Sequence, residues 1–466
     1  MPPARTDSSP AADRAVWLTA TALALCLFGL VHDTSYLGAE QTSAESDENI
    51  EQEEKFRQSV DAAPIQRKAG FLGMLGVATL CLLQRPAGVR LRWGVLGALV
   101  LLSLAWAAAS YSWSTDRNET ARELVRLSAY AAVGAALARR FDAHQLCLVL
   151  AGALAVSVAL AVGAEVLTAN FRPWIPDYRI RGTLHANVLA RQALLAAIAG
   201  AALWIYARDT GPWKLVTLAM VAVLLLTRSR TGAVTFIVAL ATLPLLGASL
   251  RSLTLTTCAA LGLAGAALLG STFGGTWLQR QAADAATLGR NEDVTSLAGR
   301  IPLWMSIWKE ARTQSMRGFG YGAFWLPEKT QDIGEELKWY PRHAHSAYVE
   351  IMVNLGLVGL ALVIATALSA AVRAGQIAGA TGLAEYRVFG AWLIAGLVNG
   401  VAEAAFVLPR DLGLIVSSTI FALLMVHPRV QRALTLSPRA SAQLLAPRAL
   451  SRSQPWSHQG PKLDPA

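Results

Sequence analysis

Apolar runs of roughly helix length alternate with short polar segments along most of the chain. A helix needs about 20 apolar residues to cross the hydrocarbon core of a bilayer, and about 17 to 25 are tolerated. Measured against that length, the sequence predicts about 12 membrane segments, at 15–31, 69–84, 93–112, 123–138, 144–167, 187–206, 213–227, 231–248, 253–271, 345–372, 388–407 and 413–427. The predicted fold is an all-α polytopic membrane protein with about 12 transmembrane helices.

The composition supports a membrane protein. Of the 466 residues, 54% are hydrophobic and only 15% are charged, compared with about one quarter charged in soluble domains. The chain has 41 Lys and Arg against 31 Asp and Glu, a net charge of +10. In a membrane protein the location of these charges matters more than their sum, so no nucleic-acid partner is inferred. The four cysteines lie in apolar runs without ligand-like spacing, which predicts neither disulfides nor a metal site.

The distribution of charges predicts which loops face the cytoplasm. Loops on one side of the predicted helices are rich in arginine, for example at Arg139 and Arg140, and the basic tail lies on the same side. Under the positive-inside rule both termini, 1–14 and 428–466, are cytoplasmic. The loop 32–68 carries nine acidic residues against four basic ones, which agrees with translocation to the periplasm. The tail is expected to be disordered, with weak attraction to anionic membrane lipid.

This topology divides the rest of the chain into three parts. Residues 15–271 hold the first nine helices, 272–344 form a large periplasmic loop that contains helices, and 345–427 hold the last three helices. Within the loop, apolar residues at helical spacing predict a helix with one apolar face, formed by Ile301, Trp304, Ile307 and Trp308. Glycines among aromatic residues then predict a tight turn, at Gly318, Gly320 and Gly322.

Polar residues collect at helix ends on the predicted periplasmic side. They include the arginines Arg181, Arg230 and Arg300, the histidines His185, His343 and His345, and Asn187. Arginines near membrane depth are costly and usually face a cavity or an anionic partner, so such a cluster indicates a functional site. Because the guanidinium fork matches phosphate oxygens, several of them suit a pyrophosphate group.

The segment that begins at His345 follows a recognisable spacing. His345 is followed by a serine, nine further residues and a Gly-x-x-Gly pair at Gly356 and Gly359, which are expected to permit close helix packing beneath the site. Taken with a Ser-Arg-Thr-Gly turn at 229–232 and a Gly-Arg pair at 299–300, this pattern resembles the O-antigen ligase and O-antigen polymerase superfamily.

The resemblance, which extends over 179–359, implies a reaction and a place for it. Ligases of this superfamily transfer a glycan from undecaprenyl pyrophosphate to the lipid A core, and the polymerases join repeat units, both at the periplasmic face of the bacterial inner membrane. These enzymes are taken to be inverting glycosyltransferases that need no metal or other cofactor. By correspondence with the motifs, His345 is the catalytic histidine, and Arg230 and Arg300 bind the diphosphate.

The chemistry of these residues favours the same roles. An acceptor hydroxyl loses its proton as it attacks the anomeric carbon, and a histidine, with a pKa near about 6.5, is suited to accept it. A diphosphate leaving group needs charge stabilisation more than protonation, which Arg230 and Arg300 supply, with Arg181 as a third candidate. The predicted periplasmic side has no acidic Asp-x-Asp cluster, so no metal site is expected.

Each candidate residue also has a structural interpretation. His345 could cap its helix, Arg230 could extend to the interface, and Arg300 could stack on a tryptophan. The possible substrate-binding residues are His343, His185, Asn187, Tyr321 and Trp325. Of these, His185 and Asn187 could serve only as helix-entry residues, and the two aromatic residues could be interfacial anchors.

Several classes of function are compatible with the sequence. The first is a ligase acting on the lipid A core, and the second is a polymerase that extends a growing polysaccharide of O-antigen or exopolysaccharide repeats, which the segment 320–325 also resembles. A relative that glycosylates proteins from the same donor is a further alternative. The third class is a membrane transporter. Against it, the two halves show no internal repeat, and the polar cluster lies at one face rather than at the midplane.

Overall fold

The computed structural model describes residues 10–31, 65–83, 94–175, 178–207, 212–248, 300–337, 340–341, 343–404 and 412–426. Within these ranges every regular element is a helix and no strand occurs, which confirms the predicted all-α class. Some predicted features lie outside the described residues in whole or in part: the segment 253–271, the acidic loop 32–68, the loop start 272–299 and the tail 428–466.

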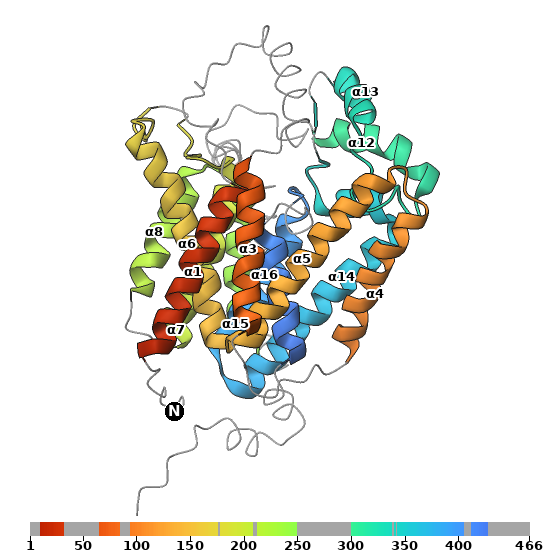
Figure 1. Cartoon of the computed structure of the whole chain (residues 1–466). Coiled ribbons are helices and arrows are strands. Elements are labelled where there is room, and N and C mark those ends of the chain that lie inside the picture. The colour runs from red at the N-terminus through yellow and green to blue at the C-terminus, as the bar shows by residue number, and fades with distance from the viewer. Residues whose placement is uncertain are drawn as a thin grey trace, which may run out of the picture.

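The helices form a bundle, which Figure 1 shows from the side. They are α1 (Pro10–Val31), α3 (Ile65–Leu83), α4 (Val95–Ala109), α5 (Arg117–Arg140), α6 (Ala143–Leu167), α7 (Ala186–Tyr206), α8 (Trp213–Leu226), α9 (Arg230–Leu245), α12 (Arg300–Ala311), α13 (Pro327–Leu337), α14 (Ala347–Thr381), α15 (Ala384–Asn399) and α16 (Leu412–Val426). Short 3-10 turns follow α4 and α12, namely η2 (Ser110–Ser112) and η3 (Arg312–Gln314).

Helix length only partly supports the predicted number of membrane segments. Four described spans are long and apolar enough to cross a membrane: Val95–Ser112, Ala143–Leu167, Ala186–Tyr206 and Ala347–Thr381. Shorter apolar helices cover Arg14–Cys26, Trp213–Leu226, Arg230–Leu245 and Gly413–Met425. The number of 12 is therefore not confirmed.

The start of α5 shows why boundaries differ from those predicted. The helix begins at Arg117 instead of residue 123, because charged residues that suggested a loop form its first turns. Asp116 makes this start possible, since its side-chain oxygen accepts the N–H groups of Asn118 and Glu119 at 2.8 and 3.0 Å.

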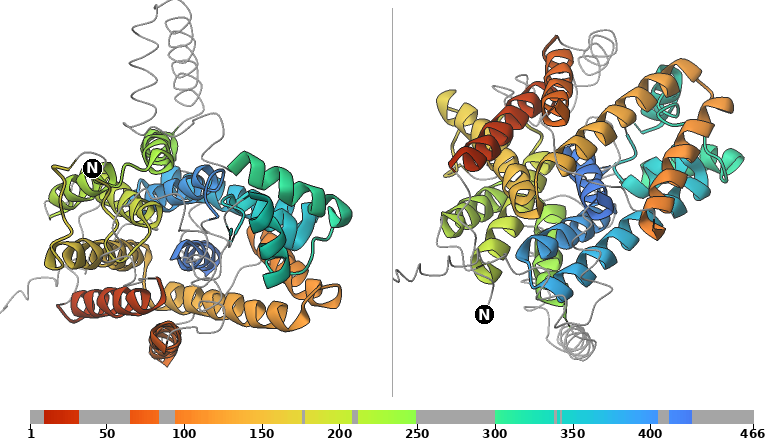
Figure 2. Two further views of the ribbon diagram at one scale, coloured as in Figure 1. Left: turned by 90° about the horizontal axis from the view of Figure 1, so that it is seen from above. Right: turned by 60° about the horizontal axis from the view of Figure 1, so that its bottom comes forward.

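The helix α15 joins two groups of helices. The helices α6 to α9 lie on one side, and α4, α5 and α14 lie on the other, while α15 contacts helices of both groups (Figures 1 and 2). At one end of the bundle α7, α9 and α14 begin and α15 ends. We call it the histidine end, because His185, His343 and His345 lie there.

The long helix α14 is broken within its length. Gly356 has φ +70° and ψ −175°, which are not helical values. The loop between η3 and α13 enters the break, where the N–H of Leu357 donates to the carbonyl of Ser315 at 2.8 Å and the N–H of Phe319 donates to that of Val353 at 2.9 Å. Within a membrane, backbone N–H and C=O groups must form hydrogen bonds inside the protein. Here the loop supplies the partners for the groups that are freed at the break. The interpretation that Gly356 permits helix packing is wrong, because loop backbone, not a helix, approaches it.

The predicted glycine turn is confirmed in that loop. All three of its glycines have positive φ, at 69° for Gly318, 108° for Gly320 and 78° for Gly322. The predicted helix before it is α12, but its buried face is formed by Leu303, Ile307 and Ala311. Two residues of the predicted apolar face, Ile301 and Trp308, are instead 38% and 51% exposed. The buried residues are spaced by four positions, and this spacing follows a different face of the same helix.

Candidate functional site

The turn that leads into α14 presents two histidines. The rings of His343 and His345 have their centroids 4.1 Å apart, and the backbone N–H of His345 donates to Nδ1 of His343 at 3.2 Å. His345 has φ +49°, a left-handed conformation that is costly for a residue with a side chain. We call residues 343–346 the histidine turn.

Contacts from two sides hold this strained turn in place. Between the histidines, the N–H of Ala344 donates to Oε2 of Glu350 at 2.8 Å, and its carbonyl accepts from Nε1 of Trp304 at 2.8 Å. Nε1 of Trp325 donates to both carboxylate oxygens of Glu350, at 2.9 and 3.0 Å. Since Glu350 belongs to α14 and Trp304 to α12, the turn is fixed relative to both helices.

A second polar group surrounds Glu403, in the turn after α15. Oε1 of Glu403 accepts from Nη2 of Arg300 at 2.8 Å and from Nδ2 of Asn187 at 2.6 Å. Oδ1 of Asn187 accepts in turn from Nη2 of Arg179 at 2.6 Å and from Oγ of Ser229 at 3.1 Å. We call these five residues the arginine network; it brings Asn187 and Glu403 together across 216 residues of sequence.

Backbone contacts join the arginine network to the histidine turn. The N–H of Ala347, the first residue of α14, donates to the carbonyls of Gly400 at 2.8 Å and Glu403 at 3.0 Å. Oγ of Ser346 also donates to the carbonyl of Gly400, at 3.3 Å. The two groups therefore form one site at the histidine end.

The surroundings keep the histidines neutral. Burial, followed by His343, Arg300 and His185, lowers the pKa of His345 to about 2. The pKa of His185 is lowered to about 4, although that residue keeps an exposed surface, by burial and by the charges of Arg179, Arg181, Arg191 and Arg300. Both imidazoles are therefore uncharged at neutral pH and can accept a proton.

Positive charge exceeds negative charge in this site. Burial raises the pKa of Glu403, an effect that the charges of Arg300, Arg191 and Arg179 oppose. The side chains of Arg300 and Glu403 are 16% and 11% exposed, so both ions lie largely away from water. An anion with several oxygens is the complementary ligand for such a cluster. Among the described residues, no three His, Cys, Asp or Glu side chains form a group that could hold a metal ion.

The structure brings most of the predicted site residues together. Asn187 and Arg300 belong to the arginine network, and His343 and His345 form the histidine turn. His185 is the N-cap residue of α7, and its Nδ1 accepts the N–H of Asn187 at 3.3 Å, so the cap is the histidine and not the asparagine.

The two remaining arginines lie beside this group. Arg181 contributes to the lowered pKa of His185. Arg230 is the first residue of α9 and directly follows Ser229, whose hydroxyl belongs to the arginine network and also accepts the N–H of Gly232 at 3.2 Å. The predicted cluster of three arginines thus forms at one end of the bundle.

A comparison with family models matches part of the chain. Residues 215–364, about a third of the sequence, match a family model described as O-antigen ligase. This region is similar to the O-antigen ligase family. The matched region contains Arg230, Arg300 and His345, and it ends before Glu403. A search of curated proteins gives no significant match.

The match supports the resemblance to the O-antigen ligase and polymerase superfamily seen in the sequence motifs. It implies a membrane enzyme of the glycosyltransferase type that acts on polysaccharide and lipid-linked substrates. The acceptor and the roles of individual residues are not specified by the match.

Two acidic residues of the site were missed in the sequence. Glu350 and Glu403 lie within the predicted segments 345–372 and 388–407, where a carboxylate is costly unless it has a partner. That cost was an available signal for both residues. The partners could not be deduced in the same way, because they come from distant segments.

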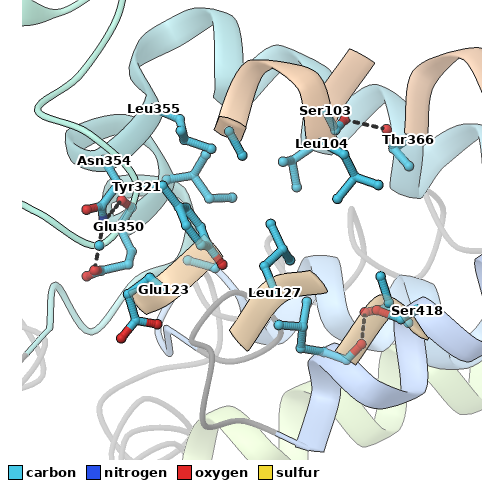
Figure 3. A pocket seen from close by; sticks show the side chains of 18 of the residues that line it. Ser103, Leu104, Glu123, Leu127, Tyr321, Glu350, Asn354, Leu355, Thr366 and Ser418 are labelled. Carbon is cyan, nitrogen blue, oxygen red and sulfur yellow. Dashed lines mark hydrogen bonds between the residues drawn. The ribbon is translucent and has the colours of Figure 1, made fainter. Parts of the chain in front are cut away.

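Tyr321 and Trp325 lie apart from the arginine network. They line a cavity of about 1090 Å³ between α3, α4, α5, α14 and α16. Figure 3 shows Tyr321 near Glu350 and Asn354 at one end of this cavity, and the hydrogen bond between Ser103 and Thr366, at 3.1 Å, farther along its wall. Because Trp325 donates to Glu350, its clearest role is to support the histidine turn.

Proposed function

We propose that this protein is an O-antigen ligase-like glycosyltransferase. It moves a glycan from undecaprenyl pyrophosphate to a hydroxyl group of the lipid A core, at the periplasmic face of a bacterial inner membrane. The observation that carries the proposal is the meeting of neutral histidines with an arginine-rich, largely buried anion site at one end of a helical bundle. Transfer from a lipid-linked diphosphate requires stabilisation of the charge on the leaving group and a side chain that accepts the hydroxyl proton. Such a site offers both.

In the proposed reaction His345 is the general base. The acceptor oxygen attacks the anomeric carbon of the glycan while the bond between that carbon and the diphosphate oxygen breaks. The hydroxyl proton passes to His345, and undecaprenyl pyrophosphate leaves with the bonding electrons. Attack from the face opposite the leaving group inverts the anomeric configuration.

The arginines act on the leaving group. Arg300, Arg230 and Arg181 bind the diphosphate oxygens and stabilise the negative charge that develops on them. The same diphosphate changes the histidine, since a nearby anion favours the imidazolium form. Donor binding therefore raises the pKa of His345 from its low value in the empty site, which makes this residue a stronger base when the donor is present.

The test is in vitro transfer by the purified full-length protein in the presence of EDTA. The donor is an undecaprenyl-pyrophosphate glycan, and the acceptor is either lipid A core or a second donor molecule. Wild type is compared with His345→Ala and with His144→Gln, a histidine replacement in the first turn of α6 at the opposite end of the bundle. We expect product on lipid A core that disappears in His345→Ala and persists in His144→Gln.

Other results lead to the alternative functions. Extension of one donor by another, instead of transfer to lipid A core, identifies a polymerase. If neither acceptor receives glycan in a His345-dependent manner, ligase and polymerase are both excluded, and a protein acceptor or transport is tested next.

Arg230→Lys tests the diphosphate role separately. This exchange keeps the charge but removes the bidentate fork, so we expect kcat/KM to fall about 10- to 100-fold, the equivalent of one or two charged hydrogen bonds. Arg312→Lys, at an exposed position in η3, is the matched control and leaves turnover unchanged. Unaltered turnover in Arg230→Lys rules out bidentate recognition at that residue.

A further inference from the structure

The cavity and the arginine network each adjoin one of the two histidines of the turn. The cavity is lined by His343, but by none of the arginines proposed to bind the diphosphate. His345, in contrast, is influenced by the charge of Arg300 and by His185. With their ring centroids 4.1 Å apart, His343 and His345 form the boundary between the two regions.

The cavity is long and mainly apolar. Along α5 its lining runs from Glu119 to Arg139, a rise of about 30 Å at ~1.5 Å per residue, which is close to the hydrocarbon thickness of a bilayer. Its middle part is walled by apolar side chains such as Leu104 and Leu127 (Figure 3), and Val363 also lines the cavity. At about 1090 Å³ it exceeds the ~300–1,000 Å³ of ordinary ligand pockets. This shape suits a hydrocarbon chain better than a glycan.

The end of the cavity near the histidine turn is polar, but it does not suit a diphosphate. Its acidic side chains include Glu119, Glu123 and Glu350. The guanidinium of Arg122 pairs with Glu119 at 3.2 Å, and that of Arg126 pairs with Glu123. Carboxylates repel a diphosphate and accept hydrogen bonds from hydroxyl groups. The saccharide of a glycolipid fits this end of the cavity.

We propose that the cavity holds the hydrocarbon anchor of the acceptor glycolipid, with its saccharide hydroxyl beside His343 and His345. This inference rests on the proposed function, because it assumes that the donor diphosphate occupies the arginine network. The two lipid-linked substrates then approach the histidine pair from different halves of the bundle. The acceptor hydroxyl and the anomeric carbon meet at the boundary that the two rings form.

The experiment narrows the cavity and compares the two substrates. Leu104→Trp fills the cavity wall on α4, and Leu102→Trp places the same side chain on the outer face of that helix, where Leu102 is 54% exposed. KM is measured for lipid A core, for its deacylated form and for the donor. We expect Leu104→Trp to raise KM for acylated lipid A core about tenfold or more, the equivalent of two excluded methylene groups. KM for the deacylated acceptor and the donor stays within about twofold, and Leu102→Trp changes none of the three.

Two other outcomes decide against the inference. A KM that is raised for the donor alone assigns the cavity to the hydrocarbon chain of the donor. Unchanged KM values for all three substrates show that the cavity has no role in substrate binding. If Leu104→Trp does not fold, Val363→Trp on α14 replaces it, with Leu368→Trp at a position 49% exposed as control. Absence of transfer in wild type counts against the proposed function, not against the cavity assignment. If wild type uses only a second donor as acceptor, that acceptor is compared with a short-chain prenyl analogue in the same variants.

Discussion

Glu403 is the residue on which the arginine network depends. It accepts hydrogen bonds from Arg300 and Asn187, and its own backbone carbonyl accepts from the first residue of α14. A largely buried carboxylate is costly by itself, but removing it leaves a buried guanidinium without its counterion, which is costlier. Glu403 therefore acts as a positioning residue for Arg300.

Substitution of Glu403 tests this role. Glu403→Ala is expected to lower the free energy of unfolding by about 3 kcal/mol, the cost of breaking a buried ion pair. Glu403→Gln keeps an acceptor oxygen for both donors, so its free energy of unfolding is expected to lie closer to that of wild type. Thermal unfolding in detergent provides the measurement. Glu336→Ala, which removes an exposed carboxylate paired with Lys309 at 2.6 Å, is the control. Equal destabilisation by Glu403→Ala and Glu336→Ala contradicts the assignment.

The pH dependence of catalysis tests the state of His345. An imidazole accepts a proton only above its pKa, and the acidic limb of kcat/KM reports the pKa of the free enzyme. Because the pKa of His345 is lowered to about 2, its protonation does not reduce kcat/KM as the pH falls from 7 to 5. The measurement is kcat/KM for the donor over this range, with unfolding followed in parallel. A limb centred near about 6.5 shows that His345 has an ordinary pKa and contradicts the electrostatic description.

At the residue scale, sequence motifs singled out Arg300 and His345, with His343 as a neighbouring candidate, and the structure places all three at the histidine end. The motifs were insufficient for Glu403 and for Arg179, which have no motif of their own. The contact of Glu403 with Asn187 spans 216 residues, and a pairing of that kind depends on how helices pack. Trp325 was predicted as a possible substrate contact or an interfacial anchor, and the structure adds that it donates to Glu350, a partner that depends on how the chain folds.

At the element scale, the break in α14 determines the shape of the site. The loop before α13 fills the break and also carries Tyr321 and Trp325, so the same segment completes the helix and supports the histidine turn. Sequence periodicity predicted the helix, and its two glycines were part of the spacing pattern that begins at His345. The pattern could not indicate the break, because Gly356 is compatible with both a packed helix and a positive φ.

A glycine replacement tests the break. Gly356→Ala forces a side chain into a region of φ and ψ that is essentially restricted to glycine, and it also meets the backbone of Met316. We expect a loss of about 1–3 kcal/mol in stability from the backbone conformation alone. Gly76→Ala in α3 is the control, since an added Cβ there meets nothing within 4 Å and favours the helix. Thermal unfolding distinguishes the two variants. Equal unfolding midpoints show that the non-helical conformation at Gly356 is not required for stability.

At the scale of the whole molecule, the proposed catalytic groups lie at one end of a bundle whose predicted orientation follows from its arginines. The all-α class and the one-sided cluster were both predictable, because apolar length and charge distribution are properties of sequence alone. The number of 12 segments was less secure, since helices such as α5 combine charged turns with apolar ones.

Cysteine labelling tests the orientation. In a cysteine-free background, Glu328→Cys lies at the start of α13 near the histidine end, and Ala380→Cys lies in the last turn of α14 at the opposite end. We expect a membrane-impermeant maleimide to label Glu328→Cys in spheroplasts and to label Ala380→Cys only after permeabilisation. The reverse pattern contradicts a periplasmic site and cytoplasmic termini.

The late position of Glu403 in the sequence determines when the site is completed during synthesis. The arginine network takes its residues from early and late parts of the chain, and Glu403 is the last of them to be synthesised. Since chains emerge from the ribosome with the N-terminus first, Arg300 and Asn187 enter the membrane before their shared acceptor exists. The site is completed only after α15 has been made. A partly synthesised chain therefore lacks the complete arginine network, which forms only when nearly the whole protein is present.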